Sequence, residues 1–115
     1  MKTSQPASAA PPIYHWIGKS GKTYPYLVFP YGTAIWELPG VYVICDELNP
    51  LQIVPVQIGE TENLEQDLAY FDMARYDECR PRHAYVHVRI ELDAAARKAE
   101  AEDLKALYQQ AYLAA

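Results

Sequence analysis

Residues 40–45, with the sequence GVYVIC, form a nearly continuous apolar run. A run of this length without alternation is typical of a strand that is covered on both faces. Residues 46–51 interrupt it with Asn49 and Pro50, and residues 52–58 then resume β character until Gly59. We therefore predict two strands joined by a short loop, with Gly59 closing the second.

Two further stretches favour strands. Residues 24–30, YPYLVFP, combine strand-forming side chains with two prolines, which predicts an edge strand. Residues 84–91, AYVHVRIE, alternate along their second half. One side of that strand is apolar, and the other carries Tyr85, His87, Arg89 and Glu91.

Two helices are expected. Leu64, Leu68 and Phe71 recur on one helical face, and either Thr61 or Asn63 is placed to cap that helix. A final helix begins at Ala94 after the capping residue Asp93. Its predicted buried stripe consists of Ala101, Leu104, Tyr108 and Tyr112, widened by Leu107 and Ala111.

These elements predict a single α+β domain, since 115 residues suffice for one hydrophobic core. We expect a small, mostly antiparallel sheet of three to four strands flanked by helices. Residues 1–12 are rich in Ser, Ala and Pro and are predicted to form a flexible N-terminal tail. The folded domain is expected over residues 13–115.

Acidic side chains are concentrated in one segment. The formal net charge is −5, and residues 60–78 alone have a balance of −6, with Arg75 their one base. A nonspecific nucleic-acid-binding protein normally presents a basic face, so this charge pattern argues against that class. The simplest interpretation of the acidic segment is a solvated, solubilising face.

Cys45 and Cys79 are too few for a disulfide framework or a zinc site. Cys45 lies in the apolar run and is expected in the core. The first residues lack the apolar stretch of a secretory leader, and no run approaches the length of a membrane span. We therefore expect a cytoplasmic protein; the sequence indicates no oligomeric state.

Two tripeptides carry a family resemblance: Gly40-Val41-Tyr42, and about fifteen residues later Gln57-Ile58-Gly59 within PVQIGETENL. Together with a distal helix containing Arg97 and residues 102–104, EDL, this layout resembles the GIY-YIG nucleases. The resemblance is greatest to the compact, single-domain bacterial members, and it extends over residues 24–108. It implies a GIY-YIG-like fold.

Members of that family hydrolyse phosphodiesters. A tyrosine hydroxyl helps to activate or orient water, a helical arginine neutralises phosphate charge, and a glutamate on the last helix holds a divalent metal. The resemblance implies a degenerate site in this chain, because most of these positions are replaced. The implied vestigial cleft contains Tyr42, Gln57 for the second tyrosine, Gly59, Asp67 for the arginine, Phe71 for a histidine, and Ala101 for the metal ligand, between Glu100 and Glu102.

Two functions follow from this resemblance. The first is a catalytically inactive binding module that needs no cofactor and binds a basic protein surface. Nucleic acid is a less favoured partner, and no membrane is involved. The acidic binding face would comprise Glu60, Glu62, Glu65, Asp67 and Asp72.

The alternative is an endonuclease with a rearranged site that uses Mg²⁺ or Mn²⁺. Tyr42 would act with a metal held by Glu100 or Glu102, and basic side chains would be recruited to the phosphate. Those bases would come from Arg75, Arg80, Arg82 or Arg89. The family resemblance requires Tyr42, Gln57, Asp67 and the 100–102 turn to line one cleft.

Overall fold

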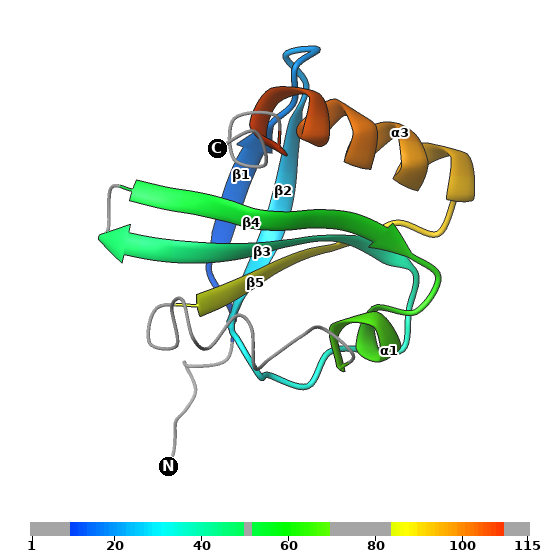
Figure 1. Cartoon of the computed structure of the whole chain (residues 1–115). Coiled ribbons are helices and arrows are strands. Elements are labelled where there is room, and N and C mark those ends of the chain that lie inside the picture. Colours follow the sequence, from blue (N-terminus) through cyan, green and yellow to red (C-terminus); the bar gives the residue numbers. More distant parts are fainter. Residues whose placement is uncertain (1–9, 50–51, 70–83, 110–115) are drawn as a thin grey trace.

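The computed structural model describes residues 10–49, 52–69 and 84–109 (Figure 1). These residues form one five-stranded antiparallel sheet with strand order β1-β2-β5-β3-β4. Helix α1 and the longer helix α3 pack against opposite faces of the sheet. The elements are β1 (Ile13–Ile17), β2 (Thr23–Pro30), β3 (Gly40–Asn49), β4 (Gln52–Thr61), α1 (Leu64–Ala69), β5 (Ala84–Ile90), α3 (Ala94–Leu104) and the π-helical turn η2 (Lys105–Gln109).

The predicted α+β class is confirmed, but the described sheet has five strands instead of three to four. The additional strand is β1, which begins at Ile13 and forms a hairpin with β2 around residues 18–22. Because β1 covers one side of β2 and β5 covers the other, β2 is an inner strand. The predicted edge position of residues 24–30 was therefore wrong.

The prolines of β2 are tolerated because neither occupies a position that must donate to a neighbouring strand. Gly18 N donates to Lys22 O at 2.9 Å and Val28 N donates to Pro12 O at 2.9 Å. The even-numbered residues of β1 and β2 are therefore the hydrogen-bonded pairs of this hairpin, and the backbone N–H and C=O groups of the odd-numbered residues point away from it. Pro25 therefore faces the β5 side, where pairing begins only at Leu27. Pro30 faces the β1 side, but β1 begins at Ile13, which pairs with Leu27, so no residue of β1 lies opposite Pro30.

Strands β3 and β4 continue further than the sequence pattern predicts. β3 runs through residues 46–49, and β4 runs past Gly59 to Thr61. Gly59 is not a strand terminator. A Cβ atom at this position would lie 2.5 Å from the hydroxyl oxygen of Tyr42, so glycine here leaves room for the tyrosine ring.

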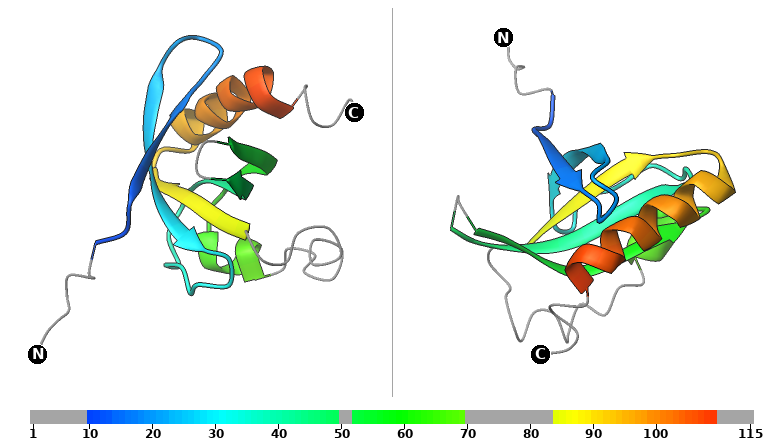
Figure 2. Two further views of the ribbon diagram at one scale, coloured as in Figure 1. Left: turned by 90° about the vertical axis from the view of Figure 1, so that its left-hand side faces the viewer. Right: turned by 90° about the horizontal axis from the view of Figure 1, so that it is seen from above.

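Strand β3 has both faces covered, as predicted, because α1 and α3 lie on opposite sides of the sheet (Figure 2). Its side chains alternate between two separate cores. Tyr42 and Ile44 point to the α1 side, whereas Val41, Val43 and Cys45 point to the α3 side. The α3-side core also contains Trp16, Tyr26, Ile58, Ala101 and Leu104, and the α1-side core contains Ile35, Leu64, Val86 and Val88.

Both helices begin at the predicted caps. The Asn63 side-chain oxygen accepts from Gln66 N at 3.1 Å, and Asp93 Oδ2 accepts from Ala96 N at 2.8 Å. Leu107, expected to widen the buried stripe of the last helix, is 44% exposed. Phe71, Cys79, Ala111 and Tyr112 lie outside the described residues. Within the described ranges, no helix has the length and apolar character needed to cross a membrane.

A buried histidine links β1 to β5 on the α3 side. Trp16 Nε1 donates to His87 Nδ1 at 2.9 Å, and His87 is 2% exposed. This hydrogen bond requires Nδ1 to be unprotonated. Burial lowers the pKa of His87 to about 4, because the imidazolium cannot be solvated there.

The folded protein should lose stability when the pH falls through the range in which an unfolded histidine takes up a proton. The pKa of His87 is lower in the folded state, so its contribution is complete above the unfolded pKa and decreases below it. We expect this residue to account for a loss of about 2 kcal/mol in unfolding free energy between about pH 7 and pH 5.

The control is His87→Asn, which keeps an acceptor for Trp16 but cannot titrate. Urea unfolding across this range should give a smaller pH dependence for the variant than for the wild type. Equal pH dependence in the two proteins would show that His87 is not held in its neutral form.

Candidate functional site

Four of the predicted cleft residues lie together on the α1 side of the sheet. Tyr42 comes from β3, Gln57 and Gly59 from β4, and Asp67 from α1. Gln57 Nε2 donates to the Tyr42 hydroxyl over 3.4 Å, and Gly59 lies directly against that hydroxyl. Tyr42 is 7% exposed, so it is a core residue.

The surroundings of Tyr42 favour the neutral phenol. Burial is the main cause that raises its pKa, and the negative charges of Asp67 and Glu60 raise it further. The amide of Gln57 acts in the opposite direction because it donates to the oxygen. The hydroxyl therefore stays protonated near neutral pH and is poorly suited to accept a proton from water.

The metal-ligand position of the family lies elsewhere. Ala101 is 2% exposed and packs in the α3-side core, with the whole sheet between it and Tyr42. Glu100 faces the same side as Ala101, and Glu102 is exposed to solvent. The single cleft that the resemblance requires is therefore not formed by the described residues, and Phe71 lies outside them.

Glu100 is engaged in a buried polar network. It is 4% exposed, accepts a hydrogen bond from the Tyr26 hydroxyl and pairs with Arg89 Nη1 at 3.2 Å. The same guanidinium nitrogen lies 3.1 Å from Glu91 Oε1. Burial raises the pKa of Glu100, whereas the Tyr26 hydrogen bond and Arg89 oppose that rise. Burial and the neighbouring Glu100 also raise the pKa of Tyr26.

A second ion pair joins the buried Arg97 to the half-buried Glu60, a residue expected on the acidic binding face. Arg97 is 3% exposed, and its Nε donates to Glu60 Oε1 at 3.0 Å. Its Nη1 also donates to the backbone oxygens of Glu91 and Leu92, at 3.2 Å each. Glu60 is thus on the α3 side and ties β4 to α3.

The exposed acidic face of α1 is smaller than the sequence suggests. Glu62, Glu65 and Asp67 are exposed, and no ion pair joins them to a base within the described residues. Asp72 lies outside that part of the chain. We use "acidic α1 face" for the exposed side chains Glu62, Glu65 and Asp67, of which only Glu65 lines the cavity described next, whereas Asp67 lies nearer Tyr42.

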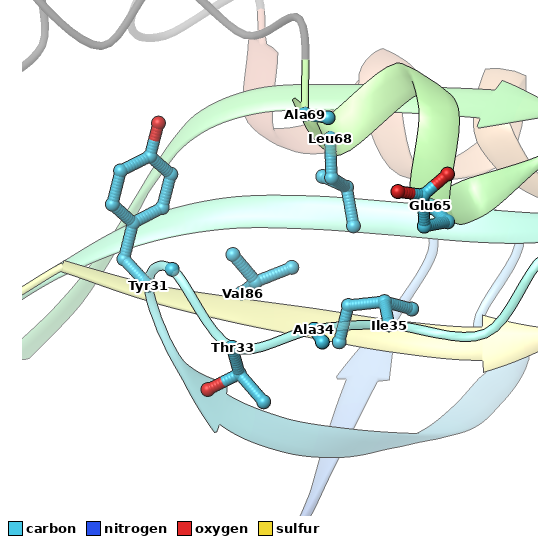
Figure 3. A pocket seen from close by; sticks show the side chains of 9 residues that line it. Tyr31, Thr33, Ala34, Ile35, Glu65, Leu68, Ala69 and Val86 are labelled. Carbon is cyan, nitrogen blue, oxygen red and sulfur yellow. The ribbon is translucent and has the colours of Figure 1, made fainter.

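A cavity of about 200 Å³ lies beside this face (Figure 3). Figure 3 shows Leu68 of α1 and Val86 of β5 directed toward the same space, with Glu65 at its side. Among the described residues that line the cavity, Glu65 is the one that carries a charge. The others are Tyr31, Gly32, Thr33, Ala34, Ile35, Leu68, Ala69 and Val86. No local sequence signal marks this cavity, because its lining comes from residues 31–35, helix α1 and strand β5, which meet only in the folded chain.

The described residues do not fit a divalent metal beside Tyr42. They contain no cluster of three or more His, Cys, Asp or Glu side chains arranged to hold an ion. Glu100 is paired with Arg89 on the opposite face. Arg89, a candidate phosphate contact, is committed to the same network, and Arg75, Arg80 and Arg82 lie outside the described residues.

Comparison of the chain with protein-family models, with curated proteins and with solved structures finds no match. The GIY-YIG resemblance therefore rests on the sequence motifs alone.

Removing the Glu100 carboxylate should be strongly destabilising. Glu100→Ala leaves the buried Tyr26 hydroxyl without its acceptor and Arg89 without its buried partner. Breaking a buried pair by removing one member costs about 3 kcal/mol of unfolding free energy. Glu102→Ala is the matched control, because its side chain is exposed, and should change stability by less than about 0.5 kcal/mol.

Chemical denaturation of the three proteins measures this difference. A Glu100→Ala variant as stable as Glu102→Ala would contradict a structural role for Glu100 and return it to the candidates for a ligand.

Proposed function

We propose that this domain is a catalytically inactive binding module, and that its acidic α1 face binds a basic segment of another protein. The observation that carries the proposal is the exposed carboxylate of Glu65 beside a mainly apolar cavity. The inactive assignment rests on Gln57, which contacts the Tyr42 hydroxyl and can act neither as an acid nor as a base.

The charge at Asp67 argues against phosphodiester cleavage. Two unit charges about 5 Å apart interact by roughly 3 kcal/mol at an effective dielectric constant of about 20. Replacing an arginine by an aspartate thus changes the interaction with a phosphate by about twice that amount. A transition state that gains negative charge would be disfavoured by several orders of magnitude in rate.

The same charge is favourable for a cationic partner. The acidic α1 face is exposed, and it adjoins a cavity whose walls are mainly apolar. A lysine or arginine side chain has an aliphatic stem and a cationic end. Its stem would pack against Leu68 and Val86 while its charge approached Glu65, so a basic peptide satisfies both features of the surface.

Charge reversal at Glu65 should weaken binding of a lysine- and arginine-rich peptide labelled with a fluorophore. Glu65→Lys removes the carboxylate at the cavity and adds a repulsive charge, so we expect the dissociation constant to rise about tenfold or more. Glu102→Lys makes the same change in net charge on α3 and should leave the dissociation constant within about twofold of wild type.

Fluorescence anisotropy at fixed ionic strength gives both constants. Equal weakening by the two substitutions would indicate a general charge effect and would contradict the assignment of the binding face to α1.

Nuclease assays test the catalytic alternative directly. The purified chain is incubated with single- and double-stranded DNA and RNA in Mg²⁺ or Mn²⁺, and we expect no cleavage above a no-protein control. Cleavage that is lost in Tyr42→Phe and Glu102→Ala would overturn the inactive assignment. Cleavage that persists in both variants would point to a contaminating nuclease.

A further inference from the structure

The outer edge of β1 is open within the described residues. β1 pairs with β2 alone, and Figure 2 shows it along one margin of the sheet. The hydrogen bonds Gly18 N to Lys22 O and Val28 N to Pro12 O show that even-numbered residues of β1 face β2. In an antiparallel pair the intervening residues point away from the partner. Ile13, His15 and Ile17 therefore direct their backbone N–H and C=O groups outward.

The side chains on this edge leave apolar surface uncovered. Ile13 is 59% exposed and Ile17 is 48% exposed, and both lie on the α1 side of the sheet, opposite Tyr14 and Trp16. Residues 13–17 contain no lysine, proline or bulge, which are the features that normally prevent an edge strand from pairing.

The other sheet edge, β4, is protected in the ways that β1 is not. Pro55 lies within it and Glu60 near its end, and its register with β3 is interrupted between Ile44 and Cys45. The turn η2 also packs against it. The contrast singles out β1 as the edge available for pairing.

The sequence of β1 is self-complementary in an antiparallel sense. Ile-Tyr-His-Trp-Ile has the same order of residue types, aliphatic, aromatic, histidine, aromatic and aliphatic, in both directions. We propose that β1 pairs antiparallel with β1 of a second copy of this chain, about a two-fold axis at His15. The two sheets then form one continuous sheet with an isologous interface.

This register uses every outward backbone group of the strand. Ile13 opposes the partner's Ile17, His15 opposes the partner's His15, and Ile17 opposes the partner's Ile13. All three are hydrogen-bonded pairs, because each member directs its N–H and C=O outward. On the α1 side, the exposed isoleucines become cross-strand neighbours.

Other registers are poorer. Shifting the pairing by two residues in one direction brings Pro11 opposite the partner's Ile17, and proline has no N–H to donate. A shift in the other direction extends the pairing past Gly18 into the turn, where the strand has ended. Of these three registers, only the one centred on His15 keeps all three hydrogen-bonded pairs within the strand.

A proline substitution tests the use of this edge. The His15 N–H points away from β2, so His15→Pro removes an outward donor without removing a hydrogen bond of the β1–β2 hairpin. Sedimentation equilibrium of the full chain over a concentration series should show a monomer–dimer equilibrium for the wild type. The variant should remain monomeric, with an unchanged far-ultraviolet circular dichroism spectrum.

Paired charges test the register. Ile13→Lys with Ile17→Lys places like charges opposite each other twice, and we expect the dimer dissociation constant to rise about tenfold or more. Ile13→Lys with Ile17→Glu places opposite charges at the same two contacts and should dimerise more tightly than the double-lysine variant. Leu92→Lys, an exposed apolar residue outside β1, is the control and should dimerise as the wild type does.

Each outcome decides the proposal. A wild-type chain that stays monomeric up to its solubility limit would overturn it. A dimer that survives His15→Pro, or that responds equally to Leu92→Lys, would place the interface elsewhere. Equal dissociation constants for the two double variants would exclude the antiparallel register about His15. Open-ended growth instead of a dimer would exclude the closed two-fold pairing.

Discussion

Burial of β3 on both faces is the constraint on which the rest of the structure depends. Successive side chains of this strand enter different cores, so Tyr42 packs beneath α1 while Val41 and Val43 pack beneath α3. Each residue of a neighbouring strand is assigned to one core by the same alternation. This separates Tyr42, Gln57 and Asp67 from Glu100 and Ala101, and it is why the chain does not assemble one catalytic cleft from the residues that its motifs suggest.

The two faces consequently have different chemistry. On the α3 side, the buried Glu100 pairs with Arg89 and the half-buried Glu60 pairs with Arg97, which fixes the last helix to β4 and β5. On the α1 side, exposed carboxylates have no such partners within the described residues and adjoin an apolar cavity. The ion pairs on the α3 side stabilise the fold. The exposed carboxylates on the α1 side form a surface that could bind a cationic side chain, as we propose for the function of the domain.

Local signals were sufficient for some elements and insufficient for others. The apolar run 40–45 and the caps Asn63 and Asp93 were predicted because their evidence lies within a few adjacent residues. β1 was missed and β2 was placed at an edge, because strand order is set by partners distant in the sequence. The burial of Glu100 and the ion pair of Glu60 also had no local signal, since both depend on where Arg89 and Arg97 lie after the sheet has formed.

Titration of the isotopically labelled chain with a lysine- and arginine-rich peptide, followed by amide chemical shifts, tests most directly whether the α1 face binds a cationic peptide and whether Tyr42 takes part in phosphodiester chemistry. If the α1 face binds the peptide and Tyr42 is not catalytic, we expect saturable changes at residues 62–68 and 31–35, little change along α3, and none of comparable size with a DNA duplex. Changes confined to α3, or a stronger response around Tyr42 to the duplex than to the peptide, would contradict this expectation.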